Sequence, residues 1–377
     1  MRFADATTMR VGGEAERWVD ASTRAEAIEA YSAILADGEP HVLLGGGSNT
    51  VASDEPFEGT VLRMRTSGVE VLPAAAPRER PTGDEEPGDD AIVIRVDAGE
   101  SWEALVERTV AEGWAGVEAL SGIPGSVGAA PIQNIGAYGQ EVGACLVGIE
   151  LLDADSLEVV HVPASRLRLG YRDSALKRGD LQGLVLSVDL RLRRTQDGLS
   201  QPVAYGQLAQ ALGVDLGRRV PLADVRESVL ALRAAKGMVL SDDPDSVSAG
   251  SFFTNPVVSS RFAATLPQDA PRWSTAPEPT PTVVPLGADA AIPHREPAEA
   301  RVKLSAAWLI ERAGIGKGFA LPHSRAAISG RHTLAITNRG GATGEQVADL
   351  ARFVQTRVEA ELGVHLVPEP VLVGVEV

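Results

Sequence analysis

The sequence is poor in cysteine: Cys145 is the one cysteine among 377 residues. A single cysteine excludes an intramolecular disulfide and a cysteine-rich metal cluster, and it fits a reducing compartment. The six histidines include no His-x-x-x-His pair or comparable ligand spacing. The sequence therefore predicts no metal site. We expect Cys145, which opens an apolar strand, to be a core residue.

Long apolar runs and an excess of basic charge are also missing. The chain has no run of about eighteen apolar residues, and residues 1–6 lead into no apolar signal region. We therefore expect a cytoplasmic protein without a membrane span or a secretory signal. Acidic residues number 51 against 35 Lys and Arg. This balance argues against general binding to nucleic acid or anionic lipid, so local groups must hold any anionic ligand.

Length and composition predict more than one folded unit. The chain is longer than an average domain, and its 44% apolar residues suffice for ordinary cores. Residues 73–90 and 267–300 are instead rich in Ala, Pro, Gly and acidic residues, so we interpret them as surface insertions. The polar turn at 195–198 predicts a boundary between two units.

Helix and strand signals alternate along the first half of the chain. Thr23 begins a capping box, and the apolar spacing after it continues to Gly38, which predicts a helix. Ser101 caps a second predicted helix that ends at Gly113. Further strands are predicted at 41–44, 91–96, 145–153 and 184–193, and further helices at 221–235 and from the Thr343 capping box to Leu362. The chain therefore begins as α/β, and its last third is α+β.

Two glycine-rich loops stand out. Gly45–Asn49 follows a strand that we expect to be buried, and its backbone N–H groups suit either a phosphate or a plain turn. The loop has Thr50 where a dinucleotide fingerprint needs glycine, and it lacks the Gly-Lys-Ser/Thr of a Walker loop. The second loop, Ser121–Gly143, is small-sided and weakly charged. Such a segment indicates either backbone wrapped around a flat ligand or a buried loop.

Two later segments, 170–174 and 249–256, place polar residues in apolar or glycine-rich surroundings. Taken alone, Ser251 is interpreted as a turn hydroxyl, because no Gly-x-Ser-x-Gly elbow surrounds it and no base can be assigned. Arg172 alone is interpreted as part of a surface ion pair.

Taken together, these motifs resemble the UDP-N-acetylenolpyruvoylglucosamine reductase (MurB) family. Several spaced motifs in the right order are far rarer by chance than any one of them. The resemblance covers nearly the whole chain apart from the two insertions, and Tyr205 matches the substrate-loop tyrosine of the family's longer class. The motifs that carry it are Leu44–Asn49, Ile123–Gly128, Pro131–Gly139, Tyr171–Ser174, Gly250–Pro256 and Pro368–Glu369.

The resemblance implies an α+β chain: a two-domain FAD-binding fold of the vanillyl-alcohol oxidase/p-cresol methylhydroxylase type plus a C-terminal α+β substrate domain. The expected divisions are residues 1–68, 69–197 and 198–377. It also implies an enzyme of peptidoglycan precursor synthesis that uses NADPH and FAD. The reaction reduces the enolpyruvyl ether of UDP-N-acetylglucosamine enolpyruvate to the lactyl ether of UDP-N-acetylmuramate. The expected oligomeric state is a monomer or weak oligomer.

The resemblance also implies roles for individual residues. Arg172 meets the enediolate that forms on the substrate, Ser251 protonates the neighbouring carbon, and Glu369 occupies the matching carboxyl position, with its protonation state left open. Thr254 stands where many members carry lysine, and Asp245 lies near where a basic phosphate contact is sought, so the diphosphate contacts stay unassigned. The expected FAD-binding residues are Leu44, Gly45, Gly46, Gly47, Ser48, Asn49, Ile123, Pro124, Gly125, Ser126, Gly128, Ala129 and Ile135. The expected substrate-binding residues are Tyr205, Asn255, Tyr138 and His332.

Two other functions stay open at this stage. One is a different FAD-dependent oxidoreductase on the same scaffold, and the other is a non-catalytic flavin or UDP-sugar binding protein. The first is not expected to combine Tyr-Arg-Asp-Ser, Gly-Ser-Phe-Phe and a late Pro-Glu. The second has no need of Arg172, Ser251 and Glu369.

Overall fold

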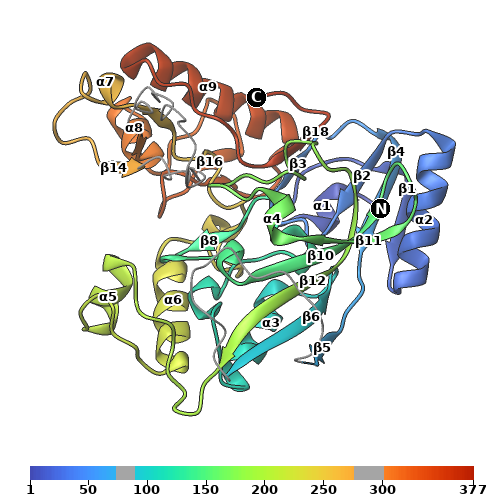
Figure 1. The fold of residues 1–377 in the computed structure, drawn as a ribbon. Coiled ribbons are helices and arrows are strands. Elements are labelled where there is room, and N and C mark those ends of the chain that lie inside the picture. The colour runs from blue at the N-terminus through green and yellow to red at the C-terminus, as the bar shows by residue number, and fades with distance from the viewer. Residues whose placement is uncertain (74–89, 276–300) are drawn as a thin grey trace, which may run out of the picture.

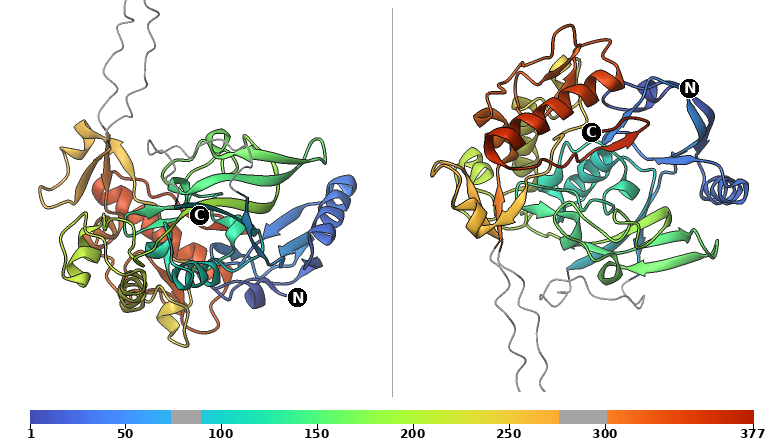
Figure 2. Two further views of the ribbon diagram at one scale, coloured as in Figure 1. Left: turned by 60° about the horizontal axis from the view of Figure 1, so that its bottom comes forward. Right: turned by 90° about the horizontal axis from the view of Figure 1, so that it is seen from above.

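The N-terminal part of the chain is a small parallel sheet with one helix. The computed structural model describes residues 1–73, 90–275 and 301–377. Figure 2 shows the N-terminal part (blue) at one side of the molecule, with its longer helix outermost. The sheet has the order β1–β4–β2. Its elements are α1 (Phe3–Ala6), β1 (Ala15–Ala21), α2 (Arg24–Asp37), β2 (His41–Leu44) and β4 (Phe57–Met64).

A larger antiparallel sheet follows, in the order β11–β10–β12–β6–β5, with β7 joined to the end of β12. Short 3-10 turns at 118–120, 127–129 and 142–144 and the small hairpin of β8 with β9 shape the second glycine-rich loop. The elements are β5 (Val69–Leu72), β6 (Ala91–Asp97), α3 (Trp102–Ala111), β7 (Trp114–Ala115), β8 (Gly136–Ala137), β9 (Gln140–Glu141), β10 (Leu146–Asp153), β11 (Val159–Pro163), α4 (Ala164–Leu167) and β12 (Gly183–Arg194).

The rest of the chain forms a helical pair and a C-terminal part. Helices α5 (Gly206–Leu212) and α6 (Leu222–Ala235) pack on each other and lie together at one corner of the molecule (Figure 1). The C-terminal part contains a sheet of order β13–β15–β14 and a hairpin of β16 with β17, and α9 packs against that hairpin and against α8. Its elements are β13 (Val257–Ser259), α7 (Ser260–Ala263), β14 (Arg272–Thr275), β15 (Arg301–Leu304), α8 (Ala306–Arg312), β16 (Ala326–Ile328), β17 (Ile336–Asn338) and α9 (Gly344–Leu362).

One more strand pair joins the C-terminal part to the N-terminal part. Strand β18 (Val371–Val373) runs parallel to β3 (Thr50–Ala52), which directly follows the first glycine-rich loop. The N–H of Val371 also donates to the carbonyl oxygen of Asn49 at 2.8 Å. The first glycine-rich loop is therefore braced by a strand from the far end of the chain.

The capping signals place the helices correctly. Thr23 Oγ1 accepts the Glu26 N–H at 3.2 Å, and Glu26 Oε2 accepts the Thr23 N–H at 3.2 Å, which completes the predicted capping box. Gly38 ends α2 in the left-handed conformation, with φ of 66°. Ser101 Oγ caps α3 through the N–H of Ala104 at 3.3 Å. Local hydrogen bonding therefore sets these helix ends, as the sequence predicted.

Two predictions of local structure are wrong in part. Residues 41–44 form a strand, but only Leu44 is buried, because β2 lies at the edge of its sheet. Thr343 accepts the N–H of Gln346 at 3.1 Å, but the Gln346 side chain does not close the box. Its amide oxygen instead accepts the N–H of Arg325 at 3.0 Å, because the tertiary structure offers a competing donor.

The predicted insertions and Cys145 have separate outcomes. Residues 272–275, inside the predicted insertion 267–300, form β14 and pair with β15, so that insertion was predicted to begin too early. Residues 74–89 and 276–300 lie outside the described part of the chain. Cys145 is buried, and burial raises the pKa of its thiol to about 12, which confirms the prediction of a core residue.

Candidate active site

A cavity of about 590 Å³ lies where the second glycine-rich loop meets the C-terminal part. Arg172, Ser251 and Glu369 all line it, although long stretches of sequence separate them. Residues of both glycine-rich loops contribute to the same wall. The fold therefore brings the three residues expected to carry chemistry into one concave site next to both loops.

The Arg172 guanidinium is held at all three of its nitrogen atoms. Its Nε lies 3.1 Å from Glu369 Oε1, its Nη1 donates to the Asn134 carbonyl at 3.2 Å, and its Nη2 donates to the Gly136 carbonyl at 2.8 Å. A guanidinium has five N–H donors, so two remain for a ligand. The Arg172 and Glu369 side chains are 21% and 13% exposed. The interpretation of Arg172 as part of a surface ion pair is therefore wrong.

Glu369 is a buried carboxyl with an altered acidity. Burial raises the pKa of Glu369 above its ordinary value, while the positive charges of Arg172 and Lys177 oppose that shift. An ionised carboxylate is costly to bury because it loses hydration. Glu369 therefore holds a proton more readily than an exposed glutamate does, even with Arg172 beside it.

Backbone hydrogen bonds fix Ser251 near Glu369. The Glu369 N–H donates to the Phe252 carbonyl at 2.9 Å, and the Phe252 N–H donates to the Leu334 carbonyl at 2.7 Å. The Phe252 and Phe253 side chains are fully buried next to Ser251, so its segment is well anchored. Within the described residues, the Ser251 hydroxyl makes no hydrogen bond. It is therefore a free donor on the cavity wall.

The two glycine-rich loops touch through their backbones. A Cβ atom added at Gly46 would lie 2.7 Å from Gly125 Cα, and one added at Gly45 would lie 2.2 Å from Ser126 Oγ. Gly125 itself has a φ of 122°, which side-chain-bearing residues rarely adopt. These glycines are required for close approach of the loops.

A second cavity of about 300 Å³ lies on the other side of this loop contact. Gly45 and Gly46 line it together with residues of α1, β4 and the segment 240–247. Arg63 and Arg65 contribute positive charge to its wall. Neighbouring residues of the first glycine-rich loop therefore line both cavities, Gly45 and Gly46 the small one and Ser48 and Asn49 the large one.

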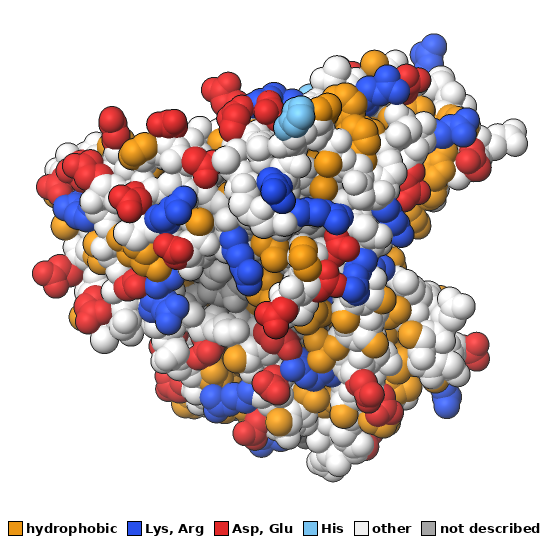
Figure 3. Space-filling view, turned by 180° about the vertical axis from the view of Figure 1, so that it is seen from behind, with side chains coloured by type: hydrophobic (Ala, Val, Ile, Leu, Met, Phe, Trp, Pro, Cys, Tyr) orange, Lys and Arg blue, Asp and Glu red, His pale blue; other side chains and the backbone are white. Residues whose placement is uncertain are grey.

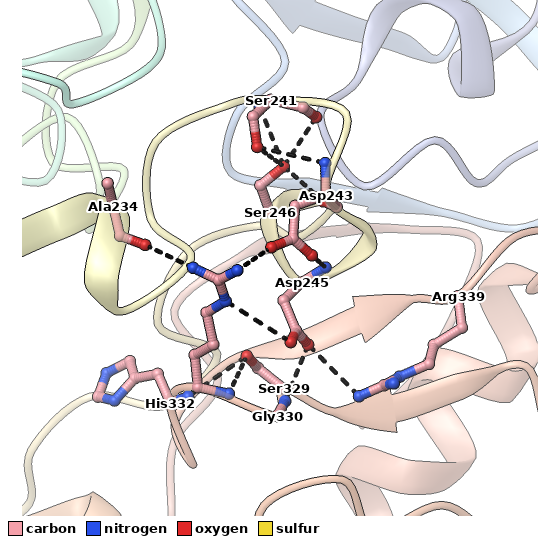
Figure 4. Close-up of polar contacts among 10 residues, drawn as sticks. Ala234, Ser241, Asp243, Asp245, Ser246, Ser329, Gly330, His332 and Arg339 are labelled. Atoms are coloured by element: carbon pink, nitrogen blue, oxygen red, sulfur yellow. Dashed lines mark hydrogen bonds and ion pairs between the residues drawn. The ribbon is translucent and has the colours of Figure 1, made fainter.

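A polar network holds the segment 240–247 in place (Figure 4). Arg331 pairs with Asp243, and its Nη1 donates to the Ala234 carbonyl at 3.1 Å. Asp245 lies 3.3 Å from Arg339 Nη2 and accepts the Gly330 N–H at 2.8 Å. The Asp245 carboxylate is therefore already paired, and it joins this segment to the C-terminal part.

Tyr205 lies at the mouth of the large cavity and is 45% exposed. Its ring meets the edge of Tyr138, with 5.7 Å between the centroids. The Lys236 ammonium lies 5.5 Å from the Tyr138 centroid and donates to Gln207 Oε1 at 3.0 Å. These contacts join the hairpin β8–β9 to both helices of the α5–α6 pair.

Two other expected substrate residues also line the large cavity. Asn255 Oδ1 accepts the Ala306 N–H at 2.9 Å, which orients the side chain, and the side chain also interacts with Tyr171. Burial and the nearby Lys236 and Lys317 lower the pKa of His332 to about 4. His332 is therefore a neutral side chain at physiological pH.

Asn49 has an unexpected set of contacts. Its side-chain Nδ2 lies 3.1 Å from Gln133 Oε1 and 3.1 Å from the Glu369 carbonyl oxygen. The amide of this loop residue therefore supports the backbone of Glu369.

The structure places the expected residues in three groups. The large cavity is lined by Ser48, Asn49, Ile123, Pro124, Gly125, Ser126, Ala129, Ile135, Tyr138, Arg172, Tyr205, Ser251, Asn255, His332 and Glu369. The small cavity is lined by Gly45 and Gly46. Neither cavity is lined by Leu44, Gly47 or Gly128; Gly47 packs against Ala6, and Gly128 packs against Ala98.

The sequence assigned no role to several cationic residues of the large cavity. Arg233 and Lys236 come from the end of α6, and Lys303, in β15, places its ammonium 4.7 Å from the Tyr171 ring centroid. Arg233 is buried, and its Nε has no hydrogen-bond partner among the described residues. The signal that could have found the first two is their spacing of three, which puts both on one helical face.

The described residues show no alternative centre of other chemistry. Within residues 1–73, 90–275 and 301–377, no group of three or more His, Cys, Asp or Glu is arranged to hold a metal ion. No helix in this part of the chain is long and apolar enough to cross a membrane. On the face in Figure 3, Lys and Arg side chains are interspersed with Asp and Glu and form no continuous basic surface.

Two family models match the chain. One, described as an FAD binding domain, matches residues 15–161. The other, described as the C-terminal domain of UDP-N-acetylenolpyruvoylglucosamine reductase, matches residues 243–373. Together they account for both glycine-rich loops and for Ser251 and Glu369.

Curated relatives and a solved structure match over nearly the full length. The UDP-N-acetylenolpyruvoylglucosamine reductase of Leifsonia xyli is 55% identical over 98% of this chain and 97% of its own. That of Saccharopolyspora erythraea is 45% identical over 98% of this chain and 94% of its own. The crystal structure of the same reductase from Thermus caldophilus superposes with a TM-score of 0.60 at 24% identity, over 99% of this chain and 97% of its own, and so shares the fold.

Proposed function

The chain belongs to the UDP-N-acetylenolpyruvoylglucosamine reductase family, and from this premise we propose how its own residues carry out the reaction. It is an FAD-dependent oxidoreductase of peptidoglycan synthesis that uses NADPH to convert UDP-N-acetylglucosamine enolpyruvate into UDP-N-acetylmuramate. Its architecture is an FAD-binding fold followed by the family's C-terminal α+β domain. We divide it at residues 68/69 and 197/198, and we assign it to the cytoplasm as a monomer or weak oligomer without a nucleic-acid partner.

The site fits FAD. The two cavities flank the Gly45–Asn49 loop, as an extended dinucleotide with a central pyrophosphate requires, and the glycines let backbone approach that group closely. Residues 123–126, Ala129 and Ile135 supply a mostly apolar wall for a flat ring in the large cavity. Bound FAD would supply the transfer of a hydride from NADPH to the substrate.

Arg172 stabilises the negative charge that develops on the substrate. Hydride addition to the enolpyruvyl double bond leaves an enediolate on the substrate, and fixed N–H donors stabilise such a charge better than mobile water does. The two N–H donors that remain on Arg172 are available to the enediolate. The contacts of the guanidinium with Glu369, Asn134 and Gly136 keep it from turning.

Ser251 supplies the proton. The carbon next to the carboxylate needs one proton after hydride addition, and the Ser251 hydroxyl has no internal partner to compete for it. Glu369 lies one backbone hydrogen bond away from the Ser251 segment and keeps Arg172 oriented. No covalent intermediate with the enzyme is needed, so Ser251 acts as an acid and not as a nucleophile.

The substrate diphosphate and sugar occupy the cationic side of the large cavity. Lys236, Arg233 and Lys303 provide positive charge there, in the absence of a lysine at Thr254. Asn255 and neutral His332 offer hydrogen bonds, and Tyr138 with Tyr205 offers an aromatic wall. The position of Asp245 does not oppose this assignment, because Arg331 and Arg339 neutralise it.

The convergence of Ser251 with the Arg172–Glu369 pair in one cavity carries the residue assignment, and separating the two half-reactions tests it. We expect Ser251→Ala to leave flavin reduction by NADPH unchanged and to slow flavin reoxidation by the enolpyruvyl sugar by roughly 10²–10⁴-fold. Stopped-flow absorbance of the flavin measures both steps. Reoxidation at the parent rate would show that Ser251 is only a turn hydroxyl. Heat extraction and chromatography identify the bound flavin as a companion check. Recovery of FMN would contradict the proposal that a dinucleotide uses both cavities.

A further inference from the structure

Arg172 is held in an unfavourable backbone conformation. Its φ is 54°, in the left-handed region that residues with side chains rarely occupy. The turn around it is closed by Gly170 and Asp173, whose backbones exchange hydrogen bonds of 3.0 and 3.3 Å. Such strain persists only where the surroundings impose it, so contacts outside this turn must fix the arginine.

Asn134 supplies those contacts. Its side chain is buried, and it also has a left-handed φ, of 47°. Its Nδ2 donates to the Gly170 carbonyl at 3.0 Å and to Glu141 Oε2 at 3.1 Å, while its Oδ1 accepts the Gly143 N–H at 2.9 Å. One side chain therefore ties the arginine turn to the end of β9 and to the turn that follows it.

The backbone of the same segment holds the guanidinium directly. The carbonyl of Asn134 accepts from Arg172 Nη1, and the carbonyl of Gly136 accepts from Nη2. These carbonyl groups can hold the guanidinium plane only if the hairpin keeps its place relative to the arginine turn. The bonds of the Asn134 side chain fix that relation.

We propose that Asn134 is a positioning residue that sets the plane of the Arg172 guanidinium relative to Glu369 and the substrate carboxylate. It does not line the cavity, although its neighbours Gln133 and Ile135 do. Asn134 therefore acts through Arg172 and touches neither substrate nor cofactor. The inference rests on the proposed function, because it assigns a residue that supports the same reaction.

A double-mutant cycle tests this role. Asn134→Gly keeps a left-handed backbone available and removes only the side chain. We expect it to slow flavin reoxidation by the enolpyruvyl sugar by roughly 100-fold, because a small misplacement of a catalytic group has an effect of that size. Flavin reduction by NADPH should stay at the parent rate. In an Arg172→Lys background, the same substitution should slow flavin reoxidation by less than about threefold, because the planar guanidinium that Asn134 positions is already lost.

Two further variants keep the test decisive. Asn134→Asp retains the acceptor for the Gly143 N–H and loses both donors, so it replaces Asn134→Gly in the cycle if the glycine variant does not fold. Ser187→Ala is the matched control, because it removes a buried hydrogen bond of 2.7 Å to Glu150 in the same part of the molecule without touching Arg172. We expect it to lower the melting temperature and to leave both half-reactions unchanged.

Each result has one interpretation. If the two substitutions slow flavin reoxidation independently, so that their effects multiply in the double variant, the positioning role is overturned. Equal losses in both half-reactions would overturn it as well. Failure of the parent protein to reoxidise with the enolpyruvyl sugar would instead overturn the proposed function, and the inference with it. Non-additivity confined to the second half-reaction supports the proposal.

Discussion

Two regions of the site use glycine for opposite purposes. In the cofactor cradle, defined as residues 45–49 and 123–128, a Cβ atom at Gly46 would lie 2.7 Å from backbone of the facing loop. In the tyrosine arm, defined as residues 199–220, a Cβ atom at Gly206 would meet nothing within 4 Å. The loop backbones of the first region are in close contact, whereas the second region has open space around Gly206.

The cores behind the two regions differ in the same way. The cradle loops lie beside sheets that contribute many fully buried residues to one large apolar core, such as Leu62, Ile94 and Val188. The tyrosine arm packs through a small cluster that includes Val203, Leu208 and Val229. Local opening is easier where fewer apolar contacts must be broken. The comparison indicates that the loops we propose for FAD are held rigidly, whereas the arm we propose for the substrate packs through fewer apolar contacts.

The largest expected effect comes from breaking the cradle. Gly46→Ala forces a methyl group into the backbone of Gly125, which cannot yield as a flexible side chain would. We expect flavin affinity to fall roughly 100-fold, because overpacking of this kind costs about 1–3 kcal/mol. Fluorescence titration of the apoprotein with FAD measures it. Retention of flavin at parent affinity would show that the loops are not rigidly opposed.

The next effect belongs to the tyrosine arm. Tyr205→Ala removes a half-exposed ring that contacts Tyr138 at the cavity mouth. We expect the KM for the UDP-sugar to rise about tenfold, the order of one aromatic contact, while flavin affinity stays constant. Steady-state kinetics with Tyr205→Phe as control separates ring packing from the hydroxyl. A loss of flavin in Tyr205→Ala would contradict the distinction between the regions.

A pH-dependent effect is expected at Glu369, whose carbonyl contacts Asn49 of the cradle. The folded protein raises the pKa of Glu369 above its ordinary value, so the folded state binds this proton more tightly than the unfolded chain does. The parent therefore loses stability as pH rises from the ordinary pKa of glutamate through the raised value. We expect the melting temperature of Glu369→Gln, relative to the parent, to increase by a few degrees across that window and to be constant in more acidic buffer. A difference independent of pH would contradict the raised pKa.

The smallest effect is the counterpart of the first. Gly206→Ala adds a methyl group to open space at the first residue of α5. We expect the free energy of unfolding to rise by about 0.5 kcal/mol, because alanine loses less backbone freedom on folding than glycine does. Denaturant titration measures this change, and flavin affinity should not respond. A fall in flavin affinity comparable to that expected for Gly46→Ala would remove the contrast on which the comparison depends.

Local signals in the sequence predicted much of the fold. The Thr23 capping box, the Ser101 cap and the strand before Gly45 depend on neighbours within a few residues, and all three are present. The Thr343 box was only half right because Gln346 found a donor, Arg325, from a distant segment. Patterns that are completed within one helical turn could be predicted, and side chains with long-range alternatives could not.

The site shows the same division. Arg172, Ser251 and Glu369 could be named because each lies in a compact motif, and the structure brings all three into one cavity. The supporting contacts of Asn49 and Asn134 could not be named, since they join segments up to 320 residues apart. Buried amides carry no periodic signal in a single sequence. Their roles emerge only when the chain is folded.

The parallel pairing of β18 with β3 has a consequence for how the enzyme is made. During synthesis, residues 45–52 leave the ribosome long before the strand with which they pair. The Glu369 carbonyl that Asn49 contacts is 320 residues further along the chain. Contacts of such sequence separation form late, because a long loop must first be closed. An incompletely translated chain therefore cannot assemble the acidic half of the Arg172–Glu369 pair. On the proposed mechanism, activity therefore requires translation of the chain through Glu369.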